Sequence, residues 1–570
     1  MPALTHRFFK PAHFLIASLL SASVMHCAHV QAQAVQSLQT GPVTSTATWS
    51  GRSTVYAPNA VAATSQPLAT TAALDILQSG GNAFDAAVAA AAVLNVVEPY
   101  MTGMGGDMFA ILWDAKNERL VGLDGSGRSG SKIDTQALAQ KYDEIPNRGA
   151  VTVTVPGALA GWNDLVETYG KLSLAEVLAP AIAIAEQGFP VTPIIAQDWA
   201  GTLDVLNANE GAKATFLIDG KAPSAGQWFA NPDLAETFRR IAKDGVDTFY
   251  GGELGQEIVA GLDELGGLIT IDDLARHESQ WVEPLSIDYK GYTLHELPPA
   301  GQGIAALQML KMLENFDLSN MVHNSSEYLH TLIEAKKLAY ADLARYVADP
   351  ASMDVQPEAL LSPDYLAKRA ALIDPDQAME RAEPGSFATE SDTIYLTVAD
   401  IDGNMISLIN SVSWYFGSGV VVPGTGVVLQ NRGAGFTLEE GHPNQIAPNK
   451  RPFHTIIPAF VTRDGEPWVS YGVMSGSMQP QGHVQVLLNL IEFGMDPQEA
   501  VDAARFRHLN EKRIAVESLS PEVARALAAK GHDLEMPNGI AFGGAQLIKK
   551  LDRGWAAGSD PRKDGMAAGR

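Results

Sequence analysis

Thr393 is the residue whose type and position best fit a covalent nucleophile. It follows Asp392 and opens a run, residues 393–398, in which polar and apolar side chains alternate. Residues 402–404, Asp-Gly-Asn, then turn the chain into the apolar run 405–409, so alternation alone predicts the arms of a β-hairpin. A threonine hydroxyl is a weak nucleophile near pH 7 and needs a base within hydrogen-bond reach. On spacing alone, two interpretations stay open: an ordinary hairpin strand, and a strand that carries a nucleophile.

The same stretch resembles the start of the small subunit of γ-glutamyltransferases. These are N-terminal nucleophile (Ntn) hydrolases, in which a catalytic threonine precedes a strand that ends in an Asp-x-Asp-Gly-Asn turn. Here the threonine is Thr393 and the turn is residues 400–404. The resemblance implies that the chain cuts its own bond between Asp392 and Thr393, which frees the α-amine of Thr393. With a pKa of about 7.7 to 8.0, that amine suits general-base work near pH 7.

The resemblance covers nearly the whole chain after its first 34 residues. Matching segments of the large subunit follow in order, and they are residues 99–107, 123–128, 153–157, 297–303 and 334–342. A nucleotide-binding interpretation of the glycine turn at 99–107 fails, because it follows helical sequence and lacks the third glycine of GxGxxG.

Three further residues take catalytic positions through this resemblance. Ser411 falls where the family carries a second threonine that hydrogen-bonds the catalytic hydroxyl, and a serine keeps that donor. Ser475 and Gly476 fall in the segment whose successive backbone N–H groups form the family's oxyanion hole, for which no particular side chain is needed. Without the family match, the segment around Ser411 is a polar loop and the segment around Ser475 a turn.

The substrate-reading positions depart from the family pattern. Glutathione-cleaving members hold the glutamyl end of the substrate with a glutamine and an aspartate, where this chain has Arg432 and Gly435. His454 and Thr455 replace two serines that read the substrate carboxylate, and His454 is either a carboxylate ligand or a hydrogen-bonded loop histidine. Ser413 lies in a segment that returns polar groups toward the nucleophile, so it is a further substrate-binding candidate.

Arg128 is the expected clamp for the distal carboxylate of the substrate. It lies two positions beyond strict alignment with an arginine that the family uses. A guanidinium is the natural bidentate partner of a carboxylate, so we expect Arg128, aided by Arg432, to hold it. The alternative is an ordinary surface or structural ion pair.

Gly435 predicts which acyl group fits. It occupies the position of the aspartate that binds the α-ammonium of γ-glutamyl substrates, and an unpaired buried charge costs about 2 to 5 kcal/mol. Glutaryl groups lack the amine and escape this cost, and the pattern resembles the branch that contains glutaryl cephalosporin acylases. We therefore expect glutaryl amides to be cleaved with higher kcat/KM than γ-glutamyl amides, unless the fold brings in a neighbouring acid.

The first 34 residues have the pattern of a secretory signal. Arg7 and Lys10 precede a short apolar core, and residues 32–34, Ala-Gln-Ala, form a cleavage site. Cys27, the sole cysteine, lies in this segment, so the mature chain has no thiol for disulfides or metal binding. The sequence thus predicts an exported protein, periplasmic or secreted.

The charge balance argues against two classes of partner. The chain has 65 acidic and 40 basic side chains, for a net charge of -25, which disfavours nucleic acid and anionic membrane surfaces. We also find no run of 18 apolar residues after the signal, so membrane spanning is not expected.

These observations predict an α/β (α+β) protein with the αββα sandwich of Ntn hydrolases. A large subunit of residues 35–392 and a small subunit of residues 393–570 come from one precursor. The expected function is hydrolysis or acyl transfer on small-molecule γ-glutamyl or glutaryl-type amides, without metal or organic cofactor. Two alternatives stay open: an exported, non-catalytic binding protein on the same scaffold, and a strict dicarboxylate-monoamide acylase without transferase activity.

Overall fold

The computed structural model describes residues 52–382, 393–537 and 539–570. The predicted signal segment, with Cys27, and Asp392 lie outside these residues. All of the described residues fall within one unit, Ser45–Arg570.

The predicted hairpin forms the centre of a seven-stranded sheet. Strand β10 (Ile394–Ala399) pairs antiparallel with β11 (Met405–Ser411), so this part of the sequence prediction is confirmed. The strand order is β21-β2-β10-β11-β3-β4-β7. The remaining bounds are β21 Met566–Gly569, β2 Val61–Thr64, β3 Asp107–Asp114, β4 Arg119–Gly125 and β7 Gln280–Val282. Strands from both sides of Asp392 therefore pair with one another within one hydrogen-bonded sheet.

A second seven-stranded sheet packs against the first. Its order is β1-β20-β19-β15-β14-β9-β8, and all of its pairings are antiparallel. The bounds are β1 Val55–Ala57, β20 Trp555–Ser559, β19 Ala545–Lys550, β15 Glu466–Val473, β14 Ala459–Arg463, β9 Tyr292–Glu296 and β8 Leu285–Tyr289. At the contact, the Thr397 hydroxyl lies 2.6 Å from that of Ser470. Gly472 leaves room for the Tyr395 ring, because a Cβ at Gly472 would lie 2.4 Å from it.

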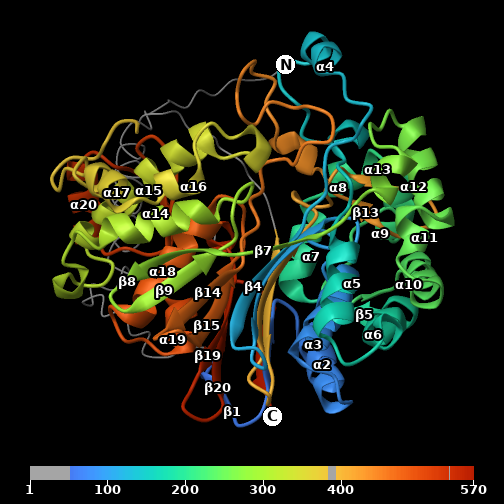
Figure 1. Ribbon diagram of the computed structural model, residues 1–570, viewed down its shortest axis with the longest axis horizontal. Helices are drawn as coiled ribbons and strands as arrows, with labels where there is room; N and C mark the ends of the chain where they lie inside the picture. Colours follow the sequence, from blue (N-terminus) through green and yellow to red (C-terminus); the bar gives the residue numbers. More distant parts are fainter. Residues whose placement is uncertain (1–51, 383–392, 538) are drawn as a thin grey trace, which may run out of the picture. The chain divides into compact units, whose positions relative to one another are not determined.

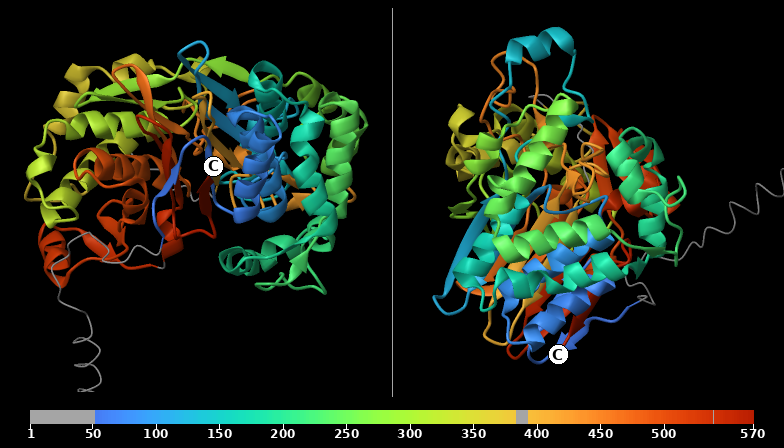
Figure 2. Two further views of the ribbon diagram at one scale, coloured as in Figure 1. Left: turned by 90° about the horizontal axis from the view of Figure 1, so that it is seen from below. Right: turned by 90° about the vertical axis from the view of Figure 1, so that its right-hand side faces the viewer.

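Helices cover the outer face of each sheet, which completes four layers (Figure 1). On the β10 side they are α2 Pro67–Gln78, α3 Ala83–Val97, α5 Ala158–Tyr169, α6 Leu174–Gln187 and α10 Pro232–Asp244. On the β15 side they are α14 Gly303–Leu313, α15 Ser326–Tyr346, α17 Pro363–Ala370, α18 Met478–Ile491, α19 Pro497–Asp502 and α20 Pro521–Ala529. Figure 2 shows the two helix groups on opposite sides of the strands. Helical sequence patterns at residues 69–97, 158–169 and 174–187 predict helices there, and the structure confirms these helices and the predicted αββα order.

Helix α3 is the most deeply buried of these elements. All 15 of its residues are buried, and alanine supplies seven of the side chains, so the helix can approach β10 and β11 closely. Asn82 caps its N-terminus through a capping box with Asp85. The Asp400 carboxylate, in the turn between β10 and β11, accepts a further bond from the Ala83 N–H at 2.9 Å. The turn of the nucleophile hairpin is thus fixed to the start of α3.

Shorter elements connect these layers. The helices are α4 Thr135–Lys141, α7 Pro193–Ala200, α8 Leu203–Asn207, α9 Glu210–Phe216, α11 Asp247–Tyr250, α12 Glu253–Glu264, α13 Ile271–Ala275 and α16 Pro357–Leu360. The strands are β5 Phe189–Pro190, β6 Trp228–Phe229, β12 Val420–Val421, β13 Val428–Leu429, β16 Phe506–Asn510, β17 Arg513–Val516 and β18 Asp533–Glu535.

One sequence expectation needs correction. Residues 351–391 are rich in Pro, Ser and charged side chains, which predicts a surface connection leading to the cut, but their described part contains α16 and α17. Leu366 and Ala370 of α17 are buried, because this helix packs on α14. None of the helices in the described residues is long and apolar enough to cross a membrane.

Candidate active site

Thr393 lies at the start of β10, directly after the predicted cut. Its side chain is fully buried, and its Oγ1 donates to Ser411 Oγ at 3.3 Å. The Nε2 of Gln479 donates to the same Thr393 Oγ1 at 3.4 Å. Pairing of Ile394 with Asn410 places Thr393 opposite Ser411, so the sheet register brings the two hydroxyls together. The Ser411 Oγ also accepts from the Ser413 N–H at 2.8 Å, which orients it.

The segment expected to form the oxyanion hole joins β15 to α18. Ser475 and Gly476 have φ values of 85° and 50°, and successive residues in this region turn backbone N–H groups toward one side. The Gly476 carbonyl accepts from Gln302 Nε2 at 2.8 Å, which fixes this peptide. Helix α18 begins two residues later, so its positive N-terminal end lies next to Thr393 through Gln479. This arrangement favours negative charge on an oxygen bound beside Thr393.

Arg432 and Asp107 form a buried pair of opposite charges. Arg432 lies in the turn Arg432–Gly435, only 2% of it is exposed, and its Nε is 3.8 Å from Asp107 Oδ2. Its Nη1 donates to Thr455 Oγ1 at 2.8 Å. Within the described part of the chain, Arg432 Nε and Nη2 and Asp107 Oδ2 have no hydrogen-bond partner. These atoms can therefore receive polar groups of a ligand.

Burial changes the protonation of this pair. Loss of hydration raises the pKa of the Asp107 carboxyl to about 7, although Arg432 opposes the shift. It also lowers the pKa of the Arg432 guanidinium to about 10, so this side chain stays cationic at neutral pH. Asp107 therefore changes charge within the physiological range.

His454 lies beside the same pair as a neutral side chain. Its Nε2 is 3.8 Å from Asp107 Oδ2, a distance that would allow an ion pair. Burial, together with Arg432 and Arg451, holds the pKa of His454 well below its usual range, so we treat the contact as polar and not ionic. His454 can serve the site as a neutral hydrogen-bonding group.

The sheet places Asp107 and Thr393 in one row. Asp107 pairs with Ser411 across β3 and β11, and Ser411 lies opposite Thr393. Paired residues present their side chains on the same face, and neighbouring strands are about 4.8 Å apart. The row therefore spans about 10 Å from the nucleophile to the Asp107 position. Sequence analysis missed this residue, although an acid directly after a glycine pair at the start of an apolar strand is a detectable signal.

Arg128 lies outside the row of Thr393, Ser411 and Asp107. Arg128 Nη1 contacts Asp349 Oδ2 and the Asn449 carbonyl, each at 3.0 Å, and 42% of the arginine side chain is exposed. It lines a cavity with Arg276 and Arg451 and no residue of the row. Its role as the carboxylate clamp stays a prediction.

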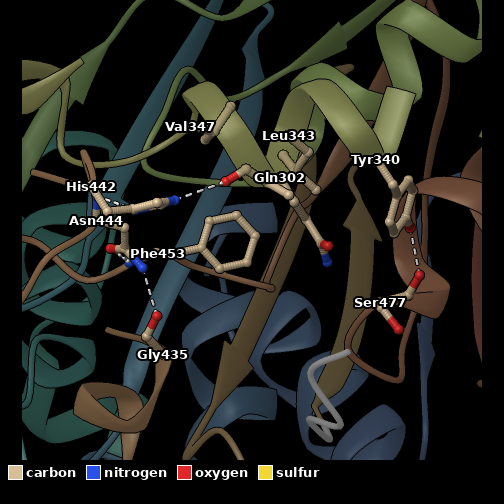
Figure 3. Close-up of a pocket in the computed structure, with 10 residues that line it drawn as sticks. Gln302, Tyr340, Leu343, Val347, Gly435, His442, Asn444, Phe453 and Ser477 are labelled. Atoms are coloured by element: carbon tan, nitrogen blue, oxygen red, sulfur yellow. Dashed lines mark hydrogen bonds between the residues drawn. The ribbon is translucent and has the colours of Figure 1, made fainter. Parts of the chain in front are cut away.

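Gly435 lines a cavity at the mouth of the site, shown in Figure 3. The empty space there is about 480 Å³, including the part open to solvent, and Gln302, Tyr340, Phe453 and Ser477 also line it. The Tyr340 hydroxyl donates to the Ser477 carbonyl, and Asn444 donates to that of Gly435 at 2.6 Å. A Cβ at Gly435 would meet the Phe453 carbonyl oxygen at 3.2 Å, so a larger side chain there needs a small shift.

In the described residues, one group has the composition of a metal site, namely His330, Glu334 and His532. Its ligand atoms are already engaged. His330 Nδ1 is 2.8 Å from His532 Nε2, and Glu334 Oε1 is 2.7 Å from the Lys337 ammonium. We therefore interpret the cluster as a structural hydrogen-bond network.

Comparison with known proteins agrees with this architecture. The family model described as gamma-glutamyltranspeptidase matches residues 69–570. The chain is 38% identical over 512 residues to a glutathione hydrolase-like YwrD proenzyme of Bacillus subtilis, covering 88% of this chain and 97% of the relative. It is 36% identical over 517 residues to an oxamate amidohydrolase proenzyme of Klebsiella pneumoniae, with 88% and 97% covered.

A solved structure has the same fold. The crystal structure of a cephalosporin acylase from Bacillus halodurans superposes with a TM-score of 0.87 at 43% identity, covering 93% of this chain and 98% of that one.

Proposed function

The chain belongs to the gamma-glutamyltranspeptidase family, and from this premise we propose that Thr393 is the nucleophile of an amidase that acts on acyl groups ending in a carboxylate. The protein is a self-processing amidohydrolase with the Ntn-hydrolase αββα fold that its sequence predicted. The hydroxyl contacts of Thr393 carry the proposal. Its Oγ1 lies 3.3 Å from Ser411 and 3.4 Å from Gln479 Nε2, directly after the predicted cut.

Maturation comes first in this scheme. The Thr393 hydroxyl attacks the Asp392 carbonyl, and hydrolysis of the resulting ester leaves a new carboxylate on Asp392 and a free amine on Thr393. Residues 35–392 and 393–570 then form the two subunits of one enzyme. We also propose that residues 1–34 direct export, to the periplasm or beyond.

The catalytic cycle uses the new amine as the base. It takes the proton of the Thr393 hydroxyl while Oγ1 attacks the substrate carbonyl, and Ser411 holds that hydroxyl in place. The Ser475 and Gly476 amides, with the N-terminal end of α18, stabilise the tetrahedral oxyanion. The C–N bond breaks, the amine leaves with the proton, and water or an acceptor amine then cleaves the acyl ester.

The row from Thr393 to Asp107 has the length that a five-carbon acyl chain needs. An extended glutaryl or γ-glutamyl group is about 5 Å long between its end carbons, so together with two contact distances it spans the row of about 10 Å. Arg432 meets the distal carboxylate, with Arg128 as a further candidate from sequence, and Ser413, His454 and Thr455 complete the polar wall. Gly435 provides no acidic side chain for the α-amine of a γ-glutamyl group, as the sequence pattern predicts for a glutaryl substrate.

The test of maturation is a denaturing gel of the purified protein. We expect two fragments from the wild type and one persistent chain from Thr393→Ala, because only the cut frees the amine. The wild-type fragments should hydrolyse glutaryl p-nitroanilide. A single wild-type chain, identical to Thr393→Ala, would contradict the proposal and favour a binding protein on this scaffold.

A further inference from the structure

Gln479 contacts the nucleophile oxygen from the start of α18. It is the second residue of that helix, and its side chain is fully buried. Its Nε2 lies 3.4 Å from Thr393 Oγ1, and its backbone N–H donates to the Gly476 carbonyl at 3.1 Å. Gln479 therefore joins the expected oxyanion segment to the nucleophile.

The orientation of the Gln479 amide follows from its other partner. The Ile457 N–H, which can only donate, lies 2.9 Å from Oε1 of Gln479. Oε1 therefore faces Ile457, and the NH2 group faces Thr393. Because the hydroxyl of Thr393 points its own hydrogen at Ser411 Oγ, its Oγ1 accepts from Gln479. Gln479 can thus act on the nucleophile only as a donor.

A second glutamine of α18 shows what a purely structural amide looks like. Gln485 is buried on the same helix, and its Oε1 accepts from the Phe506 N–H at 3.0 Å. Its Nε2 donates to the carbonyls of Gln481 and Phe506, each at 3.0 Å. Both ends of this amide therefore bond to the backbone. Gln479 has the same kind of backbone partner at Oε1, but its Nε2 faces the oxygen that reacts.

A donor on Oγ1 has unequal effects on the two halves of the catalytic cycle. In acylation, Oγ1 stays bonded to the substrate carbon while the C–N bond breaks, so stabilising charge on Oγ1 does not help the amine to leave. In deacylation, water adds to the ester and gives its proton to the Thr393 amine. The C–Oγ1 bond then breaks, and Oγ1 takes the electron pair and regains the proton from the amine.

The bond from Gln479 should strengthen in that last step. A hydrogen bond to an oxygen that carries negative charge is shorter and stronger than one to a neutral hydroxyl. The observed 3.4 Å is long, and catalytic hydrogen bonds often shorten only as the transition state forms. The bonds to Ile457 and Gly476 hold the amide in place beforehand, so little reorganisation is needed.

We propose that Gln479 is a catalytic residue that stabilises Thr393 Oγ1 as the leaving group when the acyl-enzyme is hydrolysed. This inference rests on the proposed function, because it takes Thr393 as the nucleophile. Maturation contains the same step once. Hydrolysis of the ester between the Asp392 carbonyl and Oγ1 also breaks a C–O bond and returns a proton to Oγ1, so Gln479 assists there too.

The kinetic test separates the half-reactions with glutaryl 4-nitroanilide, which releases 4-nitroaniline on acylation and glutarate on deacylation. We expect Gln479→Met, of similar length but without a donor, to slow deacylation by about 100-fold. 4-Nitroaniline should then appear in a burst equal to the amount of enzyme, and mass spectrometry should find the glutaryl group on fragment 393–570. Gln485→Met is the matched control, and it should show neither the burst nor the adduct.

Maturation gives a second measurement that needs no substrate. We expect the uncut chain to persist longer in Gln479→Met than in Gln485→Met, and hydroxylamine, which cleaves esters, to release both fragments from it. Gln479→Asn, too short to reach both Ile457 and Thr393, should behave in the same way and replaces the Met variant if that one does not fold.

Two results would overturn the inference: equal maturation rates in the Gln479 and Gln485 variants, or slow turnover of the Gln479 variant without a burst or adduct. A processed wild type that hydrolyses no glutaryl amide would instead refute the proposed substrate class, and the maturation rates would still test Gln479.

Discussion

At the scale of single residues, Asp107 offers the carboxyl group that Gly435, without a side chain, does not provide for a substrate ammonium. By the family resemblance, Gly435 stands where an aspartate would pair with the α-ammonium of a γ-glutamyl group. Asp107 supplies a carboxyl group from another strand, with its Oδ2 3.8 Å from Nε of Arg432, at the other end of the turn that contains Gly435. When ionised, Asp107 and Arg432 match the two charges of an amino-acid head group. When Asp107 is protonated, Arg432 faces a single carboxylate, as in a glutaryl group.

The acyl preference should therefore depend on pH. Burial raises the pKa of Asp107 to about 7, so below that pH the neutral carboxyl can donate to a glutaryl carboxylate, and above it the anion repels that carboxylate and attracts an ammonium. We expect the ratio of kcat/KM for glutaryl over γ-glutamyl p-nitroanilide to fall about tenfold or more between about pH 6 and 8. Both substrates use the Thr393 amine, so its titration cancels in the ratio.

The control for this prediction is Asp107→Asn, which should make the ratio independent of pH. The other groups that act on Asp107 are Arg432, cationic throughout this range, His454, neutral throughout it, the Asp124 carboxyl group, and the uncharged Gln430 amide and Gly127 N–H. Gly435→Asp should restore a γ-glutamyl preference. A γ-glutamyl preference that neither substitution alters would show that Asp107 and position 435 do not bind the α-amine of the substrate.

At the scale of elements, hydrogen bonds connect the turn between β10 and β11 to the N-terminus of α3. The Asp400 carboxylate accepts from the N–H groups of Ala83, Asp402 and Asn404 at 2.9, 2.9 and 3.1 Å. The turn therefore satisfies the N-terminus of α3 while it closes the β10–β11 pair. The position of Thr393 depends on this connection, because the turn sets the register between β10 and β11.

Removing the Asp400 carboxylate should destabilise the protein. Asp400→Ala leaves buried N–H groups without an acceptor, which costs about 1–3 kcal/mol for each unsatisfied group. The matched control is Asp402→Ala in the same turn, since Asp402 and its partner Lys171 are both about half exposed and contribute about 0–1 kcal/mol. We expect the urea midpoint to fall for Asp400→Ala and to change little for Asp402→Ala. Equal shifts would contradict the assigned role of Asp400.

At the scale of the whole molecule, the predicted cut does not divide the fold. Strand β10 pairs with β2 on one side and with β11 on the other, and β11 pairs with β3. The C-terminal strand β21 pairs with β2 at the sheet edge. Strands before and after Asp392 thus hydrogen-bond to one another across the sheet, and the helix layers bury them together.

The two mature subunits should consequently stay together. After processing, we expect the two fragments to coelute in size-exclusion chromatography in native buffer and to separate only in denaturant. Thr393→Ala, uncut, should elute at the same volume as the processed wild type. Separation of the fragments without denaturant would show that the interleaved sheet does not hold them.

The sequence by itself determined the elements that depend on local pattern. Alternation and the Asp-Gly-Asn turn predicted the β10–β11 hairpin, the Gly-Gly-Asn break at residues 80–82 predicted the start of α3, and helical sequence predicted α5 and α6. Family-like segments in the right order predicted the four layers and placed Thr393 and Ser411 as partners. The hairpin and the helices follow from periodicity and from residues near one another in the chain, whereas the layers and the Thr393–Ser411 partnership follow from the resemblance to the family.

Only the tertiary structure decided the charge and depth of the pockets. Asp107 and Arg432 are 325 positions apart in the chain, and Lys336 and His508 are 172 apart. Strand register and helix packing bring each pair into contact, and burial then raises the pKa of the Asp107 carboxyl group. Hydration, distance and burial are properties of the folded surroundings, so no local pattern in the sequence could reveal them.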